Sequence, residues 1–384
     1  MAEASAATQS SLDRGQALCS LALLKPSLIR SFAFAPLEIA LRVPFGISGG
    51  AQPAAHNVLV TVELEDGTRG YGEAAPLPPY NGETQAGALA ALGHALGWTE
   101  GRDAADWRGI AAEFRRRSGG ASGSAQCALE TALLDAIARH EGVSLWRRFG
   151  GAGTELESDM TVTTGTPLEA AEAARDIRRR GIRVIKVKVG GIGGPKEDLA
   201  RIGAILEAAP GAPLVLDGNA GLTRVEASDL AHGLKAAGIT PLLLEQWLPK
   251  DDWAGLRALG AETGWTVAAD ESVTSAATAR RLVAERAAAV INIKLMKAGI
   301  AEALDIVEVA RAAGLGLMIG GNVESILAMT MSACFAAGLG GFDYADLDTP
   351  LFLADNPFAG GYVWSGGTVS VAHIAAGHGV TPKA

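Results

Sequence analysis

The sequence predicts an α/β protein, a modified (β/α) TIM barrel with an N-terminal α+β capping domain that is completed by C-terminal residues. Three observations lead to this fold class. Eight short apolar segments follow one another between residues 159 and 348, alanine-rich helical patterns separate them, and a different pattern precedes them. Strands that alternate with helices form parallel sheets, because each crossover needs a helix. Eight such units fit a closed barrel better than an open sheet.

The region before the barrel divides into three parts. Residues 1–29 are of low complexity and are expected to be a poorly ordered extension. From residue 32 to about 72, strand-like patterns (IALRVPF, NVLVTVEL) and a turn sequence (EDGT) predict an antiparallel sheet. From residue 83 to 150, apolar residues recur every three or four positions, which is the helical period. Residues 30–152 are therefore predicted to be the α+β capping domain.

The barrel is predicted over residues 153–349, and residues 350–384 are expected to return to the capping domain. No G-x-G-x-x-G fingerprint opens a first helix, which weakens the doubly wound alternative. The eight predicted strands lie in DMTVTT, VIKVKVG, PLVLDGN, PLLLEQ, WTVAADES, VINIKLMK, LGLMIGGN and YADLD.

Composition excludes several classes of protein. The 384 residues carry 33 Lys+Arg against 42 Asp+Glu, a net charge of −9, and 48% of them are hydrophobic. A chain of this kind can bury a large core and is not disordered, and it lacks the clustered basic face of a nucleic-acid-binding protein. No apolar stretch approaches the roughly 20 residues of a membrane span. The three cysteines lie far apart in no metal or disulfide pattern, which favours a reducing cytoplasm.

Charged residues fall at or near the carboxyl ends of the predicted barrel strands, where an apolar side chain would be expected. One βα unit separates most of them; the interval from Asp217 to Glu245, for example, is 28 residues. In a parallel barrel these positions converge on one mouth, the face that holds active sites. A single acid at such a place is more often a helix N-cap than a ligand, but an ordered series across the barrel is not explained in that way. The series is Lys186, Lys188, Asp217, Glu245, Asp270, Glu271, Lys294, Glu324, Asp346 and Asp348.

Three carboxylates on adjacent strands, Asp217, Glu245 and Asp270, form an oxygen-rich site that suits Mg²⁺. Lys188 on the second strand and Lys294 on the sixth flank them from opposite sides. A buried lysine near a cation and another lysine loses proton affinity and can act as a base. Two such bases suggest removal of an α-proton from one face and its return to the other, while the metal stabilises the enediolate charge. Lys297, which follows the sixth strand, is expected to be solvated.

These residues resemble the motifs of the enolase superfamily, in particular its muconate-lactonizing subgroup, from about Phe32 onward. The motifs that carry the resemblance are K-x-K (Lys186, Lys188), DGN (Asp217), LLEQ (Glu245), ADES (Asp270) and NIKLMKAG (Lys294). The resemblance implies that the three acids bind Mg²⁺ and that Lys188 and Lys294 exchange the proton. It also implies that Lys186 lowers the pKa of its neighbour and touches the substrate carboxylate.

Within the superfamily, the chain resembles the dipeptide epimerases, of the L-Ala-D/L-Glu epimerase kind. No histidine lies between residues 232 and 373, so the branches that use a His-Asp dyad do not fit. The eighth strand reads DLDTPLFL, and its Asp346-x-Asp348 pair is similar to the signature that binds the α-ammonium group of a dipeptide. The resemblance further implies substrate contacts from Thr161 and Gly321.

Two departures from the family pattern bear on specificity. Members that act on Ala-Glu carry an arginine in the loop between the first two strands, whereas PFGISGGAQPAAHN at 44–57 has neither Arg nor Lys and places Gly50 near that position. A neutral or apolar second residue is therefore expected, with Phe45, Ile47 and Tyr80 as contacts. The double glycine after the sixth strand is reduced to Gly299-Ile300.

The sequence thus predicts a Mg²⁺-dependent isomerase that inverts the α-carbon of the C-terminal residue of a dipeptide by a two-lysine 1,1-proton transfer. The expected partner is this small-molecule substrate, without nucleic acid or membrane, and assembly into a homo-oligomer stays open. One alternative is a lyase of the same fold, such as an o-succinylbenzoate synthase or a cycloisomerase. An alternative of another class is a metal-free barrel enzyme with a Schiff-base lysine, and a non-catalytic binding protein is the last.

Overall fold

The computed structural model describes residues 26–47 and 50–383, apart from the side chains of Phe45 and Ile47. Two predicted contact residues, Phe45 and Ile47, therefore have side chains outside the described part, as does Cys19. The extension predicted over residues 1–29 falls mostly outside it as well. Its last residues are described and held, since Leu28 forms a bridge with Asp103 and Ile29 begins the first strand.

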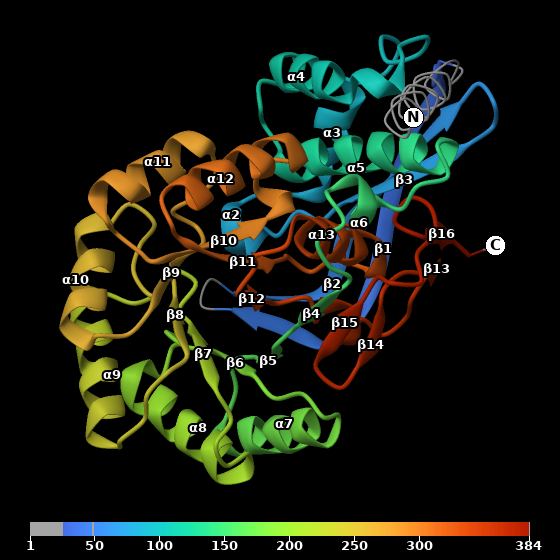
Figure 1. Cartoon of the computed structure of the whole chain (residues 1–384). Coiled ribbons are helices and arrows are strands. Elements are labelled where there is room, and N and C mark those ends of the chain that lie inside the picture. Colours follow the sequence, from blue (N-terminus) through green and yellow to red (C-terminus); the bar gives the residue numbers. More distant parts are fainter. Residues whose placement is uncertain (1–25, 48–49, 384) are drawn as a thin grey trace, which may run out of the picture.

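The first unit of the fold is an antiparallel sheet covered by helices. Strands β1 (Ile29–Ile47), β2 (Gly50–Leu64) and β3 (Arg69–Ala74) pair in this order. The buried side chains of β2 alternate with more exposed ones, and Val58, Val60 and Val62 form one apolar face. This face packs on the helical layer (Figure 1). The helices of the layer are α3 (Gln85–Gly93), η1 (Ala104–Asp106), α4 (Trp107–Ser118) and α5 (Gly123–His140). Two short helices of the same unit, α2 (Pro78–Asn81) and α6 (Leu145–Arg148), lie before and after them in the chain.

The second unit is the predicted barrel, and its eight strands pair in parallel in sequence order. They are β5 (Met160–Val162), β6 (Ile185–Lys188), β7 (Leu214–Asp217), β8 (Leu243–Glu245), β9 (Val267–Ala269), β10 (Val290–Lys294), β11 (Gly316–Gly320) and β12 (Tyr344–Ala345). A parallel bridge between Ser158 and Ala345, with a hydrogen bond from the Asp159 N–H to the Ala345 carbonyl at 2.9 Å, joins the last strand to the chain entering the first. The predicted fold class is confirmed.

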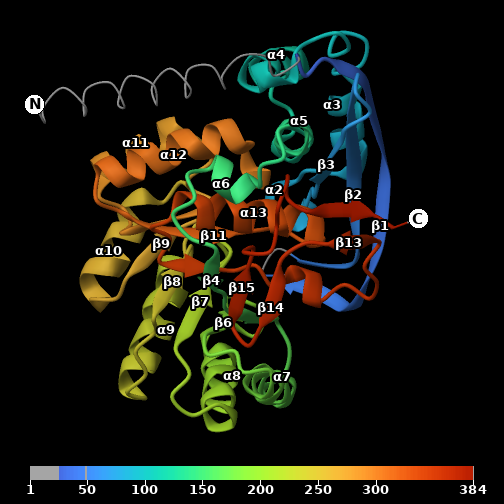
Figure 2. The same ribbon diagram turned by 45° about the vertical axis from the view of Figure 1, so that its right-hand side comes forward.

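Helices surround the barrel, as Figures 1 and 2 show, and they begin where the sequence provides caps. Thr166 and Thr223 form capping boxes with the glutamates three residues later, which satisfies N–H groups of the first helical turn. The barrel helices are α7 (Pro167–Arg179), α8 (Gly194–Ala208), α9 (Arg224–Ala236), α10 (Trp253–Thr263), α11 (Ala276–Glu285), α12 (Ile300–Ala312) and α13 (Ile326–Leu339).

The interior of the barrel is layered. Val215, Leu243, Ala268, Val290 and Met318 form one apolar cluster. Side chains two residues apart on a strand share a face. The positions two residues beyond Val215, Leu243 and Val290 are Asp217, Glu245 and Asn292, so a polar layer follows the apolar one toward the mouth. This alternation explains how apolar strands carry charged residues at their ends.

The C-terminal segment contacts both units. Leu353 bridges Leu41 of β1, and His378 Nε2 lies 2.9 Å from the carbonyl oxygen of Tyr71 on β3. Strands β14 (Val363–Ser365) and β15 (Thr368–Ser370) form a small sheet with β4 (Glu155–Glu157), and β13 (Phe358–Gly360) pairs with β16 (Val380–Pro382). Figure 2 shows these red strands beside the blue strands of the N-terminal unit. These contacts support a return of the segment to the capping domain, and the division at 30–152, 153–349 and 350–384 stays a prediction.

The two units are also tied together by α5. Glu130 on this buried helix accepts hydrogen bonds from the N–H groups of Ile300 and Ala301, the first residues of α12. The carboxylate thus sits at the positive end of α12 and satisfies two of its N-terminal donors. Among the described helices, none is long and apolar enough to cross a membrane.

Candidate active site

A small cavity lies at the carboxyl ends of the barrel strands. It is lined both by barrel residues and by Leu77 and Tyr80, which come from the capping region. Tyr80 is a predicted substrate contact, and six predicted barrel residues meet it there, namely Thr161, Lys188, Lys294, Gly321, Asp346 and Asp348. Lys188 on β6 and Lys294 on β10 are four strands apart in a barrel of eight, so they stand on opposite sides of the cavity.

The predicted carboxylates lie next to this cavity in one row. The strand register places Lys188 beside Asp217 and Asp217 beside Glu245. The Lys188 ammonium contacts Asp217 Oδ2 at 2.5 Å. Asp217, Glu245 and Asp270 are fully buried. The structure therefore brings together the residues that the strand-end pattern singled out.

Lys186 is fully buried, and three carboxylates surround it. Its Nζ lies 3.0 Å from Asp217 Oδ2, 2.9 Å from Glu245 Oε2 and 2.6 Å from Asp346 Oδ2. A buried ammonium is tolerated only with such partners. The predicted contact of Lys186 with the substrate carboxylate stays a prediction.

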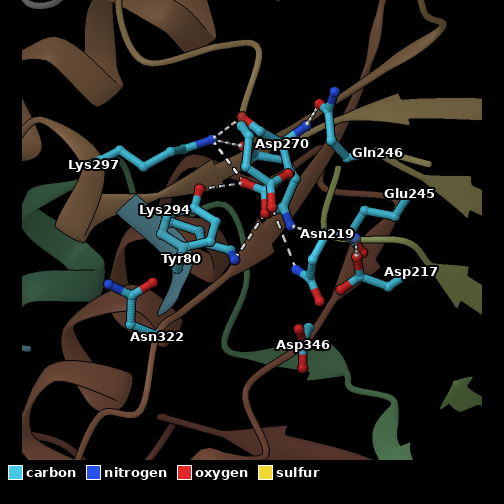
Figure 3. A network of polar contacts seen from close by, with 12 residues as sticks. Tyr80, Asp217, Asn219, Glu245, Gln246, Asp270, Lys294, Lys297, Asn322 and Asp346 are labelled. Atoms are coloured by element: carbon cyan, nitrogen blue, oxygen red, sulfur yellow. Dashed lines mark hydrogen bonds and ion pairs between the residues drawn. The ribbon is translucent and has the colours of Figure 1, made fainter. Parts of the chain in front are cut away.

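Asp270 is contacted by two further lysines, Lys294 and Lys297 (Figure 3). Oδ2 lies 2.8 Å from Lys294 Nζ, while Oδ1 lies 3.0 Å from Lys297 Nζ and accepts a hydrogen bond from the Tyr80 hydroxyl at 3.1 Å. The Tyr80 ring faces Lys294, whose Nζ is 4.3 Å from the ring centroid. The prediction of a solvated Lys297 is wrong, because the 3₁₀ turn Leu295–Lys297 directs this side chain inward and leaves only 4% of it exposed.

The charges of the site raise the pKa values of two lysines. Burial alone lowers the pKa of Lys294, but Asp270, Glu271 and Glu245 outweigh it and hold the pKa above its ordinary value. Burial also lowers the pKa of Lys186, but the carboxylates around it outweigh this effect and raise the pKa above its ordinary value. For Lys294, this direction is opposite to the lowered pKa that the sequence predicts for a buried base beside a bound cation, because carboxylates outnumber ammonium groups around it.

The lysine ammonium groups in turn lower the pKa values of two of the carboxyl groups. Burial raises the pKa of Asp270, but Lys294 and Lys297 overcome it and lower this pKa to about 2. Asp217 is likewise lowered, by Lys186 and Lys188 against the effect of burial. Both carboxylates are therefore ionised at neutral pH, as a cation ligand requires.

The donor set fits a hard divalent cation. Three buried carboxylates come from adjacent strands. Two of their oxygens are paired with lysine ammonium groups: Glu245 Oε2 lies 2.9 Å from Lys186 Nζ, and Asp270 Oδ2 lies 2.8 Å from Lys294 Nζ. Carboxylate oxygens of this kind are the ligands that Mg²⁺ prefers. Among the described residues, the acids whose oxygens gather within 4.8 Å of one another are Asp159, Asp346 and Asp348. Lys186 lies between Asp217 and Glu245, which accounts for the wider spacing of the predicted ligands.

The Asp346-x-Asp348 pair directly follows the eighth strand, β12, and faces the first strand. Asp348 Oδ2 accepts the backbone N–H of Thr161 at 2.6 Å, and Oδ1 of both Asp346 and Asp348 lacks a hydrogen-bond partner among the described residues. Burial and the Asp346 charge raise the pKa of Asp348 to about 7. Two buried acceptors without donors form a site for a cationic group.

Sequence reasoning missed three residues of this network. Asp159 precedes Thr161 by two residues, and Asn292 precedes Lys294 by two, so strand alternation could have placed both inside the barrel. Asn292 donates through Nδ2 to Glu245 Oε1 at 2.7 Å. Asn322, next to the predicted Gly321, donates to the Ala75 carbonyl at 2.9 Å and lines the cavity.

Comparison with known families identifies this architecture. Residues 30–150 match the mandelate racemase/muconate lactonizing enzyme N-terminal domain, and residues 169–384 match the domain described as enolase C-terminal domain-like. The chain belongs to the enolase superfamily. The predicted family is confirmed. Both matched domains of this chain contribute residues to the cavity.

Relatives and solved structures place the chain further within the superfamily. It is 50% identical over 355 residues to an aromatic dipeptide epimerase of Herpetosiphon aurantiacus, covering 92% of this chain and 99% of the relative. A structure from Sorangium cellulosum, titled a putative mandelate racemase/muconate lactonizing enzyme, is 58% identical, with a TM-score of 0.89 and coverage of 94% and 100%. The Enterococcus faecalis dipeptide epimerase, solved with Mg and L-Leu-L-Tyr, is 30% identical, with a TM-score of 0.87 and coverage of 92% and 99%. The predicted resemblance to dipeptide epimerases and the predicted isomerase class are confirmed.

Proposed function

We propose that this protein is a Mg²⁺-dependent dipeptide epimerase that inverts the α-carbon of the C-terminal residue through Lys188 and Lys294. One observation carries the proposal: two lysines from opposite sides of the barrel line the same cavity as the Asp346-x-Asp348 pair. A base on each face of a carbon is what inversion by proton transfer requires. A carboxylate pair with open acceptors in the same cavity supplies the partner of a free α-ammonium group.

Each lysine has a distinct role in a given direction of the reaction. One lysine, as a neutral amine, accepts the α-proton of the C-terminal residue on its own face. The other, as an ammonium, returns a proton to the opposite face, which inverts the configuration. The aromatic face of Tyr80 next to Lys294 and the carboxylates of Asp217 and Asp270 hold the two Nζ atoms in place.

Asp217, Glu245 and Asp270 would hold the metal. When bound, Mg²⁺ would stabilise negative charge on the substrate carboxylate and would neutralise carboxylates that now raise the lysine pKa values. Asp346 and Asp348 would orient the substrate through its ammonium group, with Thr161 fixing Asp348 by its N–H. Gly321 lies at the cavity wall and is packed too tightly for a side chain, since a Cβ there would lie 2.2 Å from Met329 Cε.

An apolar side chain on the C-terminal residue of the substrate fits the capping loop best. Residues 44–57 carry no arginine or lysine that could pair with an acidic side chain. A second hollow beside this loop is lined by small residues and the exposed Ile192, and also by four charged residues, Glu169, Glu197, Asp198 and Arg201. Arg201 is paired with Asp198 at 3.2 Å. The names of the Herpetosiphon relative and the Leu-Tyr complex of the Enterococcus protein support this choice. A cytoplasmic location and a homo-oligomer stay predictions.

The deciding experiment is incubation of the protein with Mg²⁺ and a mixed library of L,L-dipeptides in D₂O, followed by mass spectrometry. A gain of one mass unit in a subset of dipeptides is the expected result, and that subset defines the specificity. Absence of exchange in every dipeptide, with the metal site shown to be filled, would favour the lyase of the same fold.

A further inference from the structure

Lys297 is a buried cation that the proposed reaction does not use. It lies on the turn after β10, three residues beyond Lys294, and its side chain is almost inaccessible. Its Nζ contacts Asp270 Oδ1 at 3.0 Å, the Asp270 carbonyl at 2.9 Å and the Asn292 carbonyl at 2.6 Å. An ammonium group has three N–H donors, so these three acceptors use all of them.

Two of the three contacts go to one residue, Asp270. Lys297 therefore holds both the backbone and the carboxylate of Asp270, and it shares Oδ1 with the Tyr80 hydroxyl. Because Oδ1 is taken, Oδ2 is the oxygen directed at Lys294. Which Asp270 oxygen points toward Lys294 therefore depends on Lys297, because Lys297 is one of the two donors that hold Oδ1.

The third hydrogen bond of Lys297 goes to β10, the strand that neighbours β9 and Asp270. Asn292 gives its carbonyl to Lys297 and donates its side-chain amide to Glu245 Oε1 at 2.7 Å. The turn that carries Lys297 is itself fixed by the capping domain. A Cβ on Gly123, at the start of α5, would lie 2.1 Å from the Lys297 carbonyl oxygen, so the helix reaches this turn only because residue 123 is glycine.

We infer that Lys297 is a positioning residue that orients the Asp270 carboxylate, and through Asn292 the Glu245 carboxylate, for metal binding. The inference rests on the proposed function for its metal. Partners that orient metal-binding carboxylates typically account for 10- to 100-fold in metal affinity or activity. The lysine charge alone acts in the opposite direction, because a cation beside the site repels Mg²⁺.

The two effects predict opposite results when the ammonium is removed. In Lys297→Met, which keeps the length and the apolar stem, we expect Mg²⁺ affinity measured by titration calorimetry to fall by about 10- to 100-fold. If Lys297 contributed only its charge, Mg²⁺ would bind more tightly. If it supported only the fold, the melting temperature would fall while the Mg²⁺ affinity of the folded protein stayed unchanged. Either of these results would overturn the inference.

Two further variants complete the test. Lys196→Met removes an exposed lysine on α8 and should leave Mg²⁺ affinity unchanged. Lys297→Gln replaces Lys297→Met if that variant does not fold. Its side chain is one atom shorter and its amide has two donors, so it cannot serve all three acceptors and the Mg²⁺ affinity should still fall. A wild-type Mg²⁺ affinity would contradict the inference. A wild-type protein that binds Mg²⁺ but epimerises no dipeptide would refute the proposed function. The Mg²⁺ affinities of the wild-type protein and the Lys297 variants could still be compared in that case. Absence of Mg²⁺ binding by the wild-type protein would overturn the inference itself.

Discussion

The Lys186 ammonium lies 2.6 Å from Asp346 Oδ2, so the second strand of the barrel is tied to the eighth through a carboxylate of the proposed ammonium site. The contact engages Oδ2 and leaves Oδ1 without a hydrogen-bond partner among the described residues. Burial raises the pKa of Asp346, yet Lys186 and Lys188 outweigh it and keep the group ionised. Asp346 is thus held as an anion with one oxygen available.

Asp346→Asn should weaken the binding of dipeptides that carry a free ammonium group. A hydrogen bond to a charged group is worth roughly 1.5–3 kcal/mol, which corresponds to an increase in KM of about 10- to 150-fold. Steady-state kinetics measure this effect, and Asp355→Asn, at an exposed position of the C-terminal segment, is the matched control. A variant with unchanged KM would favour a lyase whose substrate has no ammonium group.

Lys188→Ala and Lys294→Ala should each abolish epimerisation while the fold is retained. Each variant lacks the base on one face, and general acid–base catalysis contributes roughly 10²- to 10⁴-fold. In D₂O, each variant should exchange the α-proton of only one epimer, and the two variants should differ in which epimer this is. Circular dichroism checks the fold, and Lys250→Ala, an exposed lysine, serves as the control. Full turnover by either variant would refute the two-lysine mechanism.

Removal of metal should stop the reaction. EDTA is expected to abolish epimerisation and added Mg²⁺ to restore it, because the described residues that line the cavity donate hydrogen bonds but supply no Lewis acid for the developing carboxylate charge. Glu245→Gln should lower Mg²⁺ affinity measured by calorimetry, since it replaces a buried carboxylate by a weaker neutral ligand. An enzyme that works in EDTA and is trapped by borohydride would instead be a Schiff-base enzyme.

Specificity should follow the charge of the capping loop. Dipeptides with an apolar C-terminal residue should have kcat/KM at least about tenfold above those ending in Glu, because a buried acid without a cationic partner is disfavoured. The comparison of Leu-Tyr with Ala-Glu measures this preference directly. Equal kcat/KM values for the two would contradict the proposed substrate class.

Stability should depend on pH through Glu324. Burial raises the pKa of this carboxyl to about 8, and Oε2 has no hydrogen-bond partner among the described residues. The folded state thus retains a proton that the unfolded state releases near its ordinary pKa, about 4.3, so the free energy of unfolding should fall as pH rises from about 4.3 to 8 and then level off. Glu324→Gln should remove this part of the decline. Urea denaturation at pH 5 and pH 8 tests it, and identical pH slopes in both proteins would contradict the assignment.

The strand-end pattern was sufficient to predict the barrel and the gathering of Lys188, Lys294 and the carboxylates at its mouth, because strand spacing and alternation can be read from the sequence. The roles of these residues stay predictions. Lys297 was missed because its direction depends on a 3₁₀ turn and on the backbone of Asp270, neither of which has a periodic signal. The raised pKa of Lys294 was also not predicted. It depends on how many carboxylates from distant strands surround each ammonium, as Lys186 shows with partners on β7 and β8 and beyond β12.

The position of α5 has a consequence for engineering this scaffold. Glu130 of this helix accepts hydrogen bonds from the first residues of α12, and Gly123 packs against the turn that follows Lys294. The helix, the turn and the start of α12 therefore form one continuous contact between the capping domain and the barrel. A chimaera that takes the capping domain of one relative and the barrel of another would join mismatched halves of this contact. We expect such exchanges to preserve proton transfer only when α5 and the residues from Leu295 to Ala301 are transplanted together.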